Sequence, residues 1–232
     1  MALIIRVDVD RAYGRQPLLR HVLSRVGSDL YFPKVEAFGY LAELAKILEL
    51  LNRRKASGYV FFRRCTLPSI SIMRLIGEGG HEVGLHLENS HSFDTFVGEK
   101  RMLERHTGIV VTALSKHGSG QEKYGLRHYA PYEPTKYIAW ARQSNMKLFL
   151  GNLQDPSTAP SGDTTGLKVF PSAFWLEPAW RDTKSFTIDW LLGRVRSTDV
   201  VLLVHPENVL SSHALMKDFE RLLDSTNTRI LQ

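Results

Sequence analysis

The sequence of 232 residues contains a single cysteine, Cys65. One thiol can form neither an intramolecular disulfide nor a multi-cysteine metal site, so disulfide scaffolds and zinc fingers are both excluded. Scarce cysteine is typical of proteins in a reducing compartment, and we therefore expect a cytoplasmic protein.

Long apolar runs, internal repeats and low-complexity tracts are also missing. No apolar run approaches the roughly 20 residues that would cross a bilayer, so we expect no transmembrane segment. The first ten residues, MALIIRVDVD, reach acidic residues by position 8 and lack a basic leader region. This pattern favours a first strand over an export signal.

Positive charge is in slight excess, with 30 Lys and Arg against 24 Asp and Glu and a net charge of +6. The basic residues are dispersed along the chain, and their densest groups, such as Arg63-Arg64, are typical of a solvated surface. No nucleic-acid-binding motif accompanies them. We therefore expect no nucleic-acid partner, and the sequence leaves the oligomeric state open.

Composition and hydrophobic patterning indicate one globular α/β domain over residues 1–232. Hydrophobic residues make up 43% of the chain and aromatic residues 10%, which is enough for a sizeable core. The predicted strands are 3–9, 58–63, 81–85, 109–114, 147–150, 167–170 and 200–204, and the predicted helices are 35–51, 71–76, 94–106, 135–143, 186–195 and 215–223. This alternation implies a mainly parallel sheet of about seven strands, either open or closed into a barrel.

Polar residues follow several of the predicted strands. Asp8 and Asp10 end the first strand, and His86, His117 and His205 follow three others. The carboxyl ends of parallel strands meet at one edge of the sheet, where active sites form in such folds. We therefore expect these side chains to lie together.

Asp8 and Asp10 lie on the same face of the first strand, because side chains along a strand alternate with a period of two. Two buried carboxylates need a cation, hydrogen-bond donors or a proton. Either a metal ion meets this need, or one of the aspartates caps the following turn. The segment GHEVGLHLENSH at 80–91 adds imidazole and carboxylate groups, which are ordinary ligands of zinc and similar ions.

His205 comes directly after the apolar residues 200–204 and before Pro206, which prevents the strand from continuing. We therefore expect its ring at the edge of the sheet. With an ordinary pKa of about 6.5, a histidine there can give or take a proton near neutral pH. The alternative is a core histidine bonded to a backbone carbonyl.

These motifs and their order resemble the polysaccharide deacetylases of the NodB-homology group, carbohydrate esterase family 4. The resemblance spans most of the chain. It rests on Asp8-Val9-Asp10, on GHEVGLH at 80–86 and on Leu203-Val204-His205. It implies an α/β fold of one catalytic domain, a distorted (β/α) barrel of about seven mainly parallel strands.

The resemblance also implies roles for individual residues. Asp8 would be the general base, Asp10 and His86 metal ligands, and His205 the general acid. The family's second metal-binding histidine corresponds to position 90, where this chain has a serine that is followed by a histidine. The third ligand therefore stays open, with His91 as the first candidate and Glu88, Ser90 and His117 as alternatives.

The substrate-binding residues are expected from the same resemblance. The family's arginine-proline motif is missing, and Arg127 is our candidate for the lost positive charge. Glu177 lies where the family often has an acid that orients the base, and the following Trp180 would form a wall of the pocket. Trp175 is an alternative for that wall.

The implied activity is hydrolysis of the N-acetyl group of an amino sugar or polysaccharide precursor, with a divalent metal, zinc first, as cofactor. The substrate would be a carbohydrate or an N-acetylated small molecule. Two alternatives remain open. One is an inactive carbohydrate-binding relative without full metal affinity, and the other is a metal-dependent amidohydrolase that acts on a small non-sugar amide.

Overall fold

A nine-stranded sheet forms the centre of the molecule. The structure, a computed structural model, describes residues 1–10, 40–123, 127–162 and 166–231. The strands are β1 (Leu3–Val9), β2 (Gly58–Phe62), β3 (Glu82–Leu87), β4 (Ala113–Lys116), β5 (Leu148–Leu153), β6 (Ser161–Gly162), β7 (Lys168–Ser172), β8 (Phe174–Trp175) and β9 (Val200–Val204). The helices are α2 (Tyr40–Arg53), α3 (Ile70–Glu78), α4 (Phe93–Thr107), α5 (Pro134–Gln143), α6 (Ile188–Val195), α7 (Pro206–Ser211) and α8 (His213–Ser225), with short 3-10 helices η2 (Arg64–Thr66) and η3 (Pro178–Trp180).

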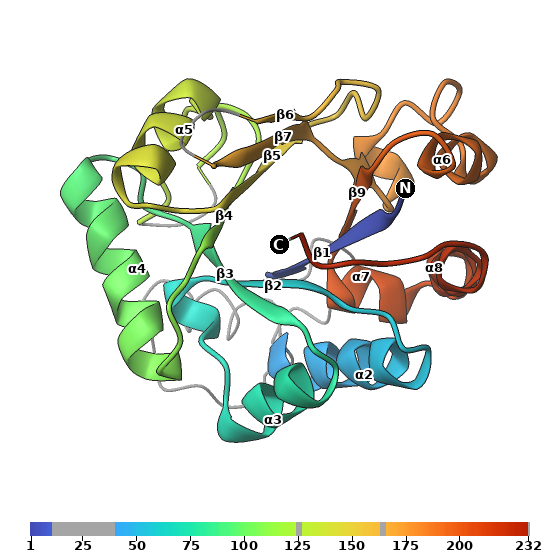
Figure 1. Ribbon diagram of the computed structural model, residues 1–232, viewed down its shortest axis with the longest axis horizontal. Coiled ribbons are helices and arrows are strands. Elements are labelled where there is room, and N and C mark those ends of the chain that lie inside the picture. The colour runs from blue at the N-terminus through green and yellow to red at the C-terminus, as the bar shows by residue number, and fades with distance from the viewer. Residues whose placement is uncertain (11–39, 124–126, 163–165, 232) are drawn as a thin grey trace.

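The strands follow the order β6-β7-β5-β4-β3-β2-β1-β9-β8, and neighbours are parallel except for β6 and β7. The sheet curls into a distorted barrel that the helices surround (Figure 1). The predicted α/β barrel is confirmed. The strand count exceeds the predicted seven because β6 and β8, each two residues long, were not recognised.

A continuous stretch of chain joins the two ends of the sheet. β7 pairs with β5 near one end, and β8 pairs with β9 at the other end. Only Ala173 separates β7 from β8, and its N–H donates to the carbonyl of Leu153 at 3.1 Å. Leu176 N–H then donates to the carbonyl of Leu203 at 3.0 Å. The chain itself therefore bridges the seam of the barrel.

The strand period of two divides the side chains of β1 between two layers. Leu3, Ile5 and Val7 belong to the larger core, which also includes buried residues of α2 and α8. Ile4 belongs to a smaller cluster with Phe61, Leu150 and other strand residues. Side chains at even positions of β1 therefore face the barrel interior.

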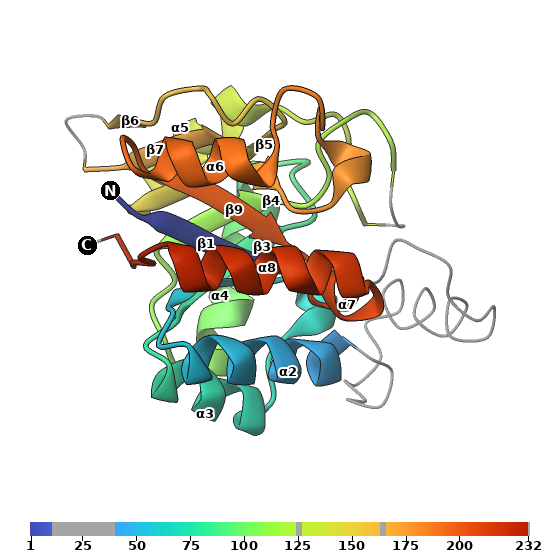
Figure 2. The same ribbon diagram turned by 90° about the vertical axis from the view of Figure 1, so that its right-hand side faces the viewer.

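The amino-terminal end of the barrel is covered by the end of the chain. Figure 2 shows both termini at this end. Leu3 forms a bridge with Thr228, and Tyr59 Oη accepts a hydrogen bond from Leu231 N–H at 2.8 Å. The opposite end, where the carboxyl ends of the strands meet, carries the polar residues.

Most predicted elements are confirmed with shifted ends. β3 continues to Leu87, so His86 lies within the strand and not after it. β4 begins at Ala113, four residues later than predicted. The reason is that Gly108 ends α4 in a left-handed conformation, with φ of 71°, and the next two residues are exposed.

The predicted helix 35–51 corresponds to α2, and residues 35–39 lie outside the described residues. Helix α7 was not predicted, because its six residues are too few to show a hydrophobic period. Within the described ranges, no helix is both long enough and apolar enough to span a bilayer.

We predict that Gly151→Ala destabilises the barrel, because the added Cβ would lie 2.2 Å from the carbonyl oxygen of Pro171 in β7. This clash can be relieved only if the backbone moves, so we expect the free energy of unfolding to fall by about 1–3 kcal/mol. Gly77→Ala in α3 is the matched control, since its Cβ meets no atom within 4 Å. It should leave stability unchanged or raise it by up to about 1 kcal/mol. Urea unfolding followed by circular dichroism measures both, and equal stabilities of the two variants would contradict the packing argument.

Candidate metal centre

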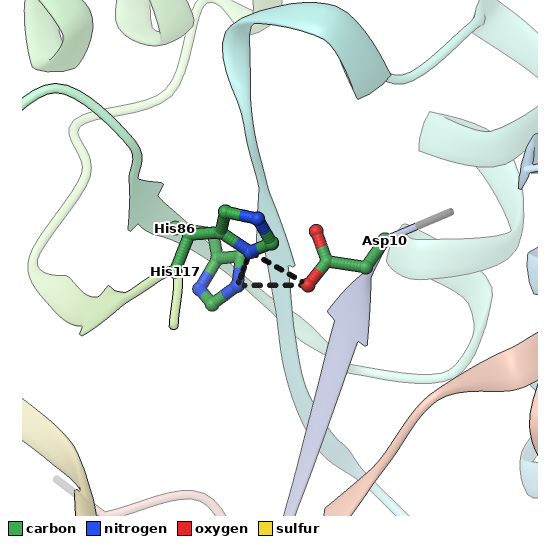
Figure 3. A group of neighbouring side chains, drawn as sticks. All are labelled: Asp10, His86 and His117. Atoms are coloured by element: carbon green, nitrogen blue, oxygen red, sulfur yellow. Dashed lines mark hydrogen bonds and ion pairs between the residues drawn. The ribbon is translucent and has the colours of Figure 1, made fainter. Parts of the chain in front are cut away.

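Three parallel strands bring one aspartate and two histidines together at their carboxyl ends. Asp10 follows β1, His86 lies near the end of β3, and His117 follows β4. Asp10 Oδ2 is 3.2 Å from His86 Nε2 and 2.9 Å from His117 Nδ1, and the two ring nitrogens are 3.3 Å apart (Figure 3). All three side chains are buried.

This triangle fits a divalent metal ion. Ligand atoms about 2.0–2.1 Å from a tetrahedral zinc ion lie about 3.3 Å from one another. The three atoms here are 2.9 to 3.3 Å apart. A carboxylate oxygen and two imidazole nitrogens are also the donor types that zinc prefers. Asp10, His86 and His117 therefore form a candidate metal centre.

The surroundings favour the protonation states that metal binding needs. Burial and the positive charge of Arg63 hold the pKa of His117 well below its usual value, so the imidazole is neutral. Burial disfavours the charge of Asp10, but the positive charge of Arg63 and the hydrogen bond with His117 hold the pKa of this carboxyl well below its usual range. The ring of His86 is oriented by a 2.7 Å contact between its Nδ1 and Ser115 Oγ.

The structure brings only some of the predicted ligands to this centre. Asp10 and His86 are there, and His117, one of the open alternatives, is the third member. His91, the first candidate, is exposed, and its ring contacts the edge of Tyr129. The reason is that β3 ends at Leu87 and the chain then turns outward into α4, which carries residue 91 away from the barrel.

The other two alternatives have partners elsewhere. Ser90 is buried, and its Oγ lies 3.3 Å from Tyr137 Oη. Glu88 is buried in an ion pair with Arg63, whose Nη1 also donates to Asp10 Oδ1 at 3.1 Å. Arg63 was expected on a solvated surface, and this expectation was wrong. Its guanidinium is buried because it neutralises two carboxylates from different strands.

Asp8 lies beside the candidate metal centre and forms an ion pair with Arg6. Arg6, two residues earlier on the same face of β1, donates from Nε to Asp8 Oδ1 at 2.9 Å and from Nη2 to Oδ2 at 2.6 Å. Its Nη1 donates to the carbonyls of Leu150 and Gly151 at 3.0 and 2.9 Å. The sequence does carry a sign of this pairing, because Arg6 is a basic residue at an inward-facing position of the buried strand β1.

Asp8 is also close to the side chains of the candidate metal centre. Its Oδ2 lies 3.5 Å from His86 Nε2. The carboxylate therefore lies between the guanidinium of Arg6 and the candidate metal centre.

His205 faces the same space from β9 and is held by Glu177. Its Nδ1 lies 2.8 Å from Glu177 Oε1, which also accepts a hydrogen bond from Asn208 at 3.1 Å. Its Nε2 lies 4.0 Å from Asp10 Oδ2. Burial opposes protonation of His205, but Glu177, Asp8 and Asp10 raise its pKa to about 9.

Two tryptophans flank the ring of His205. The centroid of Trp175 is 6.0 Å from that of His205, and the centroid of Trp180 is 5.7 Å from it. The two tryptophans meet edge to face at 5.6 Å. Both predicted wall residues are therefore present at the site, on the segment that bridges the barrel seam and on η3.

A cavity of about 670 Å³ opens over the candidate metal centre. Its lining includes both aspartates and the three histidines at the strand ends, the two tryptophans, and the loop that follows His117. Lys116 also lines it, and burial lowers the pKa of this lysine to about 7. Arg127, the predicted source of positive charge, does not line this cavity; it lines another, beside Asn89 and Glu99.

Comparison with protein-family models and with curated proteins gives no match. Solved structures do match. A protein from Mycobacterium smegmatis described as a polysaccharide deacetylase is 14% identical, with a TM-score of 0.52, and the match covers 100% of this chain and 93% of that chain. A mutant of the peptidoglycan deacetylase PdaC from Bacillus subtilis is 14% identical, with a TM-score of 0.45 and coverages of 98% and 85%.

A mutant of a CE4 family pseudoenzyme with restored enzymatic activity is also 14% identical, with a TM-score of 0.46. This match covers 95% of the present chain, which spans only 61% of that longer chain. At such identities the likeness concerns the fold alone. The chain has the fold of the NodB-homology polysaccharide deacetylases, carbohydrate esterase family 4.

Proposed function

We propose that this chain is one catalytic domain of a metal-dependent deacetylase, which hydrolyses the N-acetyl group of an amino sugar or polysaccharide precursor. The observation that carries the proposal is the triangle of Asp10, His86 and His117 beneath a cavity that Asp8 and His205 also line. A cytoplasmic location is part of the proposal and rests on the single cysteine.

Asp10, His86 and His117 would hold the divalent cation, with zinc as our first choice from the donor types. When bound, the cation supplies Lewis acidity, which lowers the pKa of water and polarises an acyl carbonyl.

Asp8 is the proposed general base. Arg6 binds both of its carboxylate oxygens, which fixes the orientation of the carboxylate in the cavity. Each oxygen of a carboxylate has more than one lone-pair site, so the fork with Arg6 leaves room to accept a proton. The attack of water on the acyl carbon releases that proton, and Asp8 is placed to take it.

His205 is the proposed general acid. Glu177 holds its Nδ1, which leaves Nε2 directed toward the metal-binding carboxylate of Asp10. With a pKa of about 9 the imidazole carries a proton at neutral pH. It can therefore protonate the amine of the sugar as the acetyl group departs.

The tryptophans support a sugar as the substrate. Trp175 and Trp180 present aromatic surface beside His205. Such surface packs well against the apolar faces of sugar rings. The two alternatives, an inactive relative and an amidohydrolase on a small amide, are separated from this proposal by metal content and by acetate release from N-acetylglucosamine oligomers.

We predict that the purified protein binds one equivalent of zinc. His117→Ala should weaken zinc binding by at least about 100-fold, because mutating a residue that only hydrogen-bonds a metal ligand already costs about 10–100-fold in metal affinity. His91→Ala is the matched control, because His91 is exposed and away from the cluster. Isothermal titration calorimetry measures both affinities. Loss of zinc binding in the His91 variant with retention in the His117 variant would reverse the assignment.

We expect Asp8→Asn to lower acetate release by about 10²–10⁴-fold, which is the usual contribution of a general base. The variant should still bind zinc, because Asp8 is not one of the three proposed ligands. Initial rates and zinc titration are measured on the same preparation. Full activity in this variant would rule out Asp8 as the base.

We expect the activity to fall on the alkaline side as His205 loses its proton near pH 9. Glu177 raises the pKa of His205, so Glu177→Gln should move the alkaline limb of the pH–rate profile to lower pH. Rates of acetate release between pH 5 and pH 10 test this shift. An alkaline limb at the same pH in both proteins would show that His205 is not the acid.

A further inference from the structure

His117 lies at the point where the chain leaves the sheet. The pairing of β4 with β5 runs as far as Ser115 and Leu150, so His117 lies past the end of that ladder. On the other side, its N–H donates to the carbonyl of Leu87 in β3 at 2.9 Å. Gly118 then has φ of 79°, a left-handed conformation that a strand does not adopt. The backbone of His117 is therefore tied to β3 by a strand-like bond, but not to β5.

Asn152 of β5 contacts this part of the chain through its side chain. Its Nδ2 donates to the carbonyl of Lys116 at 2.6 Å and to that of Gly118 at 2.9 Å. These carbonyls belong to the residues directly before and after His117. Asn152 is buried, and its own backbone N–H donates to Tyr132 Oη at 3.0 Å. One buried amide thus holds the backbone on both sides of a candidate metal ligand.

The chemistry of the amide explains why an asparagine suits this position. Its Nδ2 carries two N–H donors, one for each carbonyl. Its Oδ1 is buried and has no hydrogen-bond partner among the described residues. A buried oxygen without a partner is unfavourable, and an apolar side chain of the same size would avoid it. The two donated bonds are what such an apolar side chain could not supply.

The carbonyl of His117 itself is held by two further side chains. Lys116 Nζ donates to it, and His128 Nε2 lies 2.8 Å from it. The three successive carbonyls of residues 116–118 thus each contact a buried side-chain nitrogen. A fixed backbone limits the directions in which a side chain can point. The imidazole here points to Asp10, with Nδ1 at 2.9 Å from Oδ2.

We propose that Asn152 is a positioning residue, which holds the backbone of His117 in the orientation that brings its ring to Asp10 and His86. Asn152 is not one of the three candidate ligands and acts through His117. The inference rests on the proposed function insofar as a metal ion binds at this centre. Residues that only orient metal ligands typically contribute about 10–100-fold to metal affinity.

The first test uses cobalt(II), which occupies zinc sites and whose visible absorption depends on its coordination geometry. Asn152→Leu keeps the approximate size of the side chain and removes both donors. We expect the cobalt affinity of this variant to fall about 10-fold or more and the visible spectrum of the bound cobalt to change. Asn152→Ala, which adds no branched carbon in the buried site, should show the same effects.

Asn52→Leu is the matched control. Asn52 lies on α2 outside the candidate metal centre, and its Nδ2 donates to the carbonyl of Leu75 in α3 at 3.0 Å. This variant loses a similar bond from an amide to a carbonyl, so its stability should fall while cobalt affinity and spectrum stay unchanged. Equal changes in Asn152→Leu and Asn52→Leu would reflect a general loss of stability and would overturn the proposal. Unchanged cobalt affinity and spectrum in Asn152→Leu would also overturn it.

Hydrogen exchange in the metal-free protein separates this proposal from the proposed function. We expect the N–H of His117 to exchange about 10-fold faster in Asn152→Leu than in the unmodified protein, because loss of the amide bonds eases local opening. Asn52→Leu should leave this rate, measured by NMR, unchanged. If the unmodified chain binds no cobalt, the proposed function fails and the exchange rates alone decide the role of Asn152. Equal rates in the two variants would then refute that role.

Discussion

The need to neutralise buried carboxylates at the end of β1 governs the organisation of the site. Asp8 and Asp10 point into the end of the barrel, where an unpaired charge is strongly disfavoured. Arg6 binds Asp8 through two hydrogen bonds, while Arg63 and two histidines surround Asp10. Removing one partner of a buried ion pair typically costs about 3–5 kcal/mol. The same contacts that stabilise the barrel thus orient the groups to which the proposed hydrolysis assigns roles.

The network extends beyond the candidate metal centre through Arg63. This guanidinium pairs with Asp10 on one side and with Glu88 on the other. The backbone N–H of Glu88 donates in turn to Glu99 on α4, which lines a second cavity. One continuous set of contacts therefore joins the two cavities. Their lining residues differ, so each cavity can be altered without direct change to the other.

The seam of the barrel supplies the remaining side of the cavity over the candidate metal centre. Because β7 and β8 are separated by one residue, the chain crosses directly from β5 to β9. This crossing places Trp175 and then Glu177 against His205. A histidine at the end of β9 thereby acquires a carboxylate partner and an aromatic wall from a segment about thirty residues earlier in the chain.

The sequence by itself determined the α/β alternation, the barrel class and the strand-end positions of Asp8, Asp10, His86 and His205, because hydrophobic periodicity is a local property. Only the tertiary structure decided that His117 and not His91 joins Asp10 and His86. It also decided that Arg6 and Arg63 are buried and that Arg127 lines a separate cavity. The physical reason is that these outcomes depend on which strands are neighbours and on where the chain leaves the barrel after Leu87. Neither the pairing of distant charges nor the direction of a loop is encoded in local spacing.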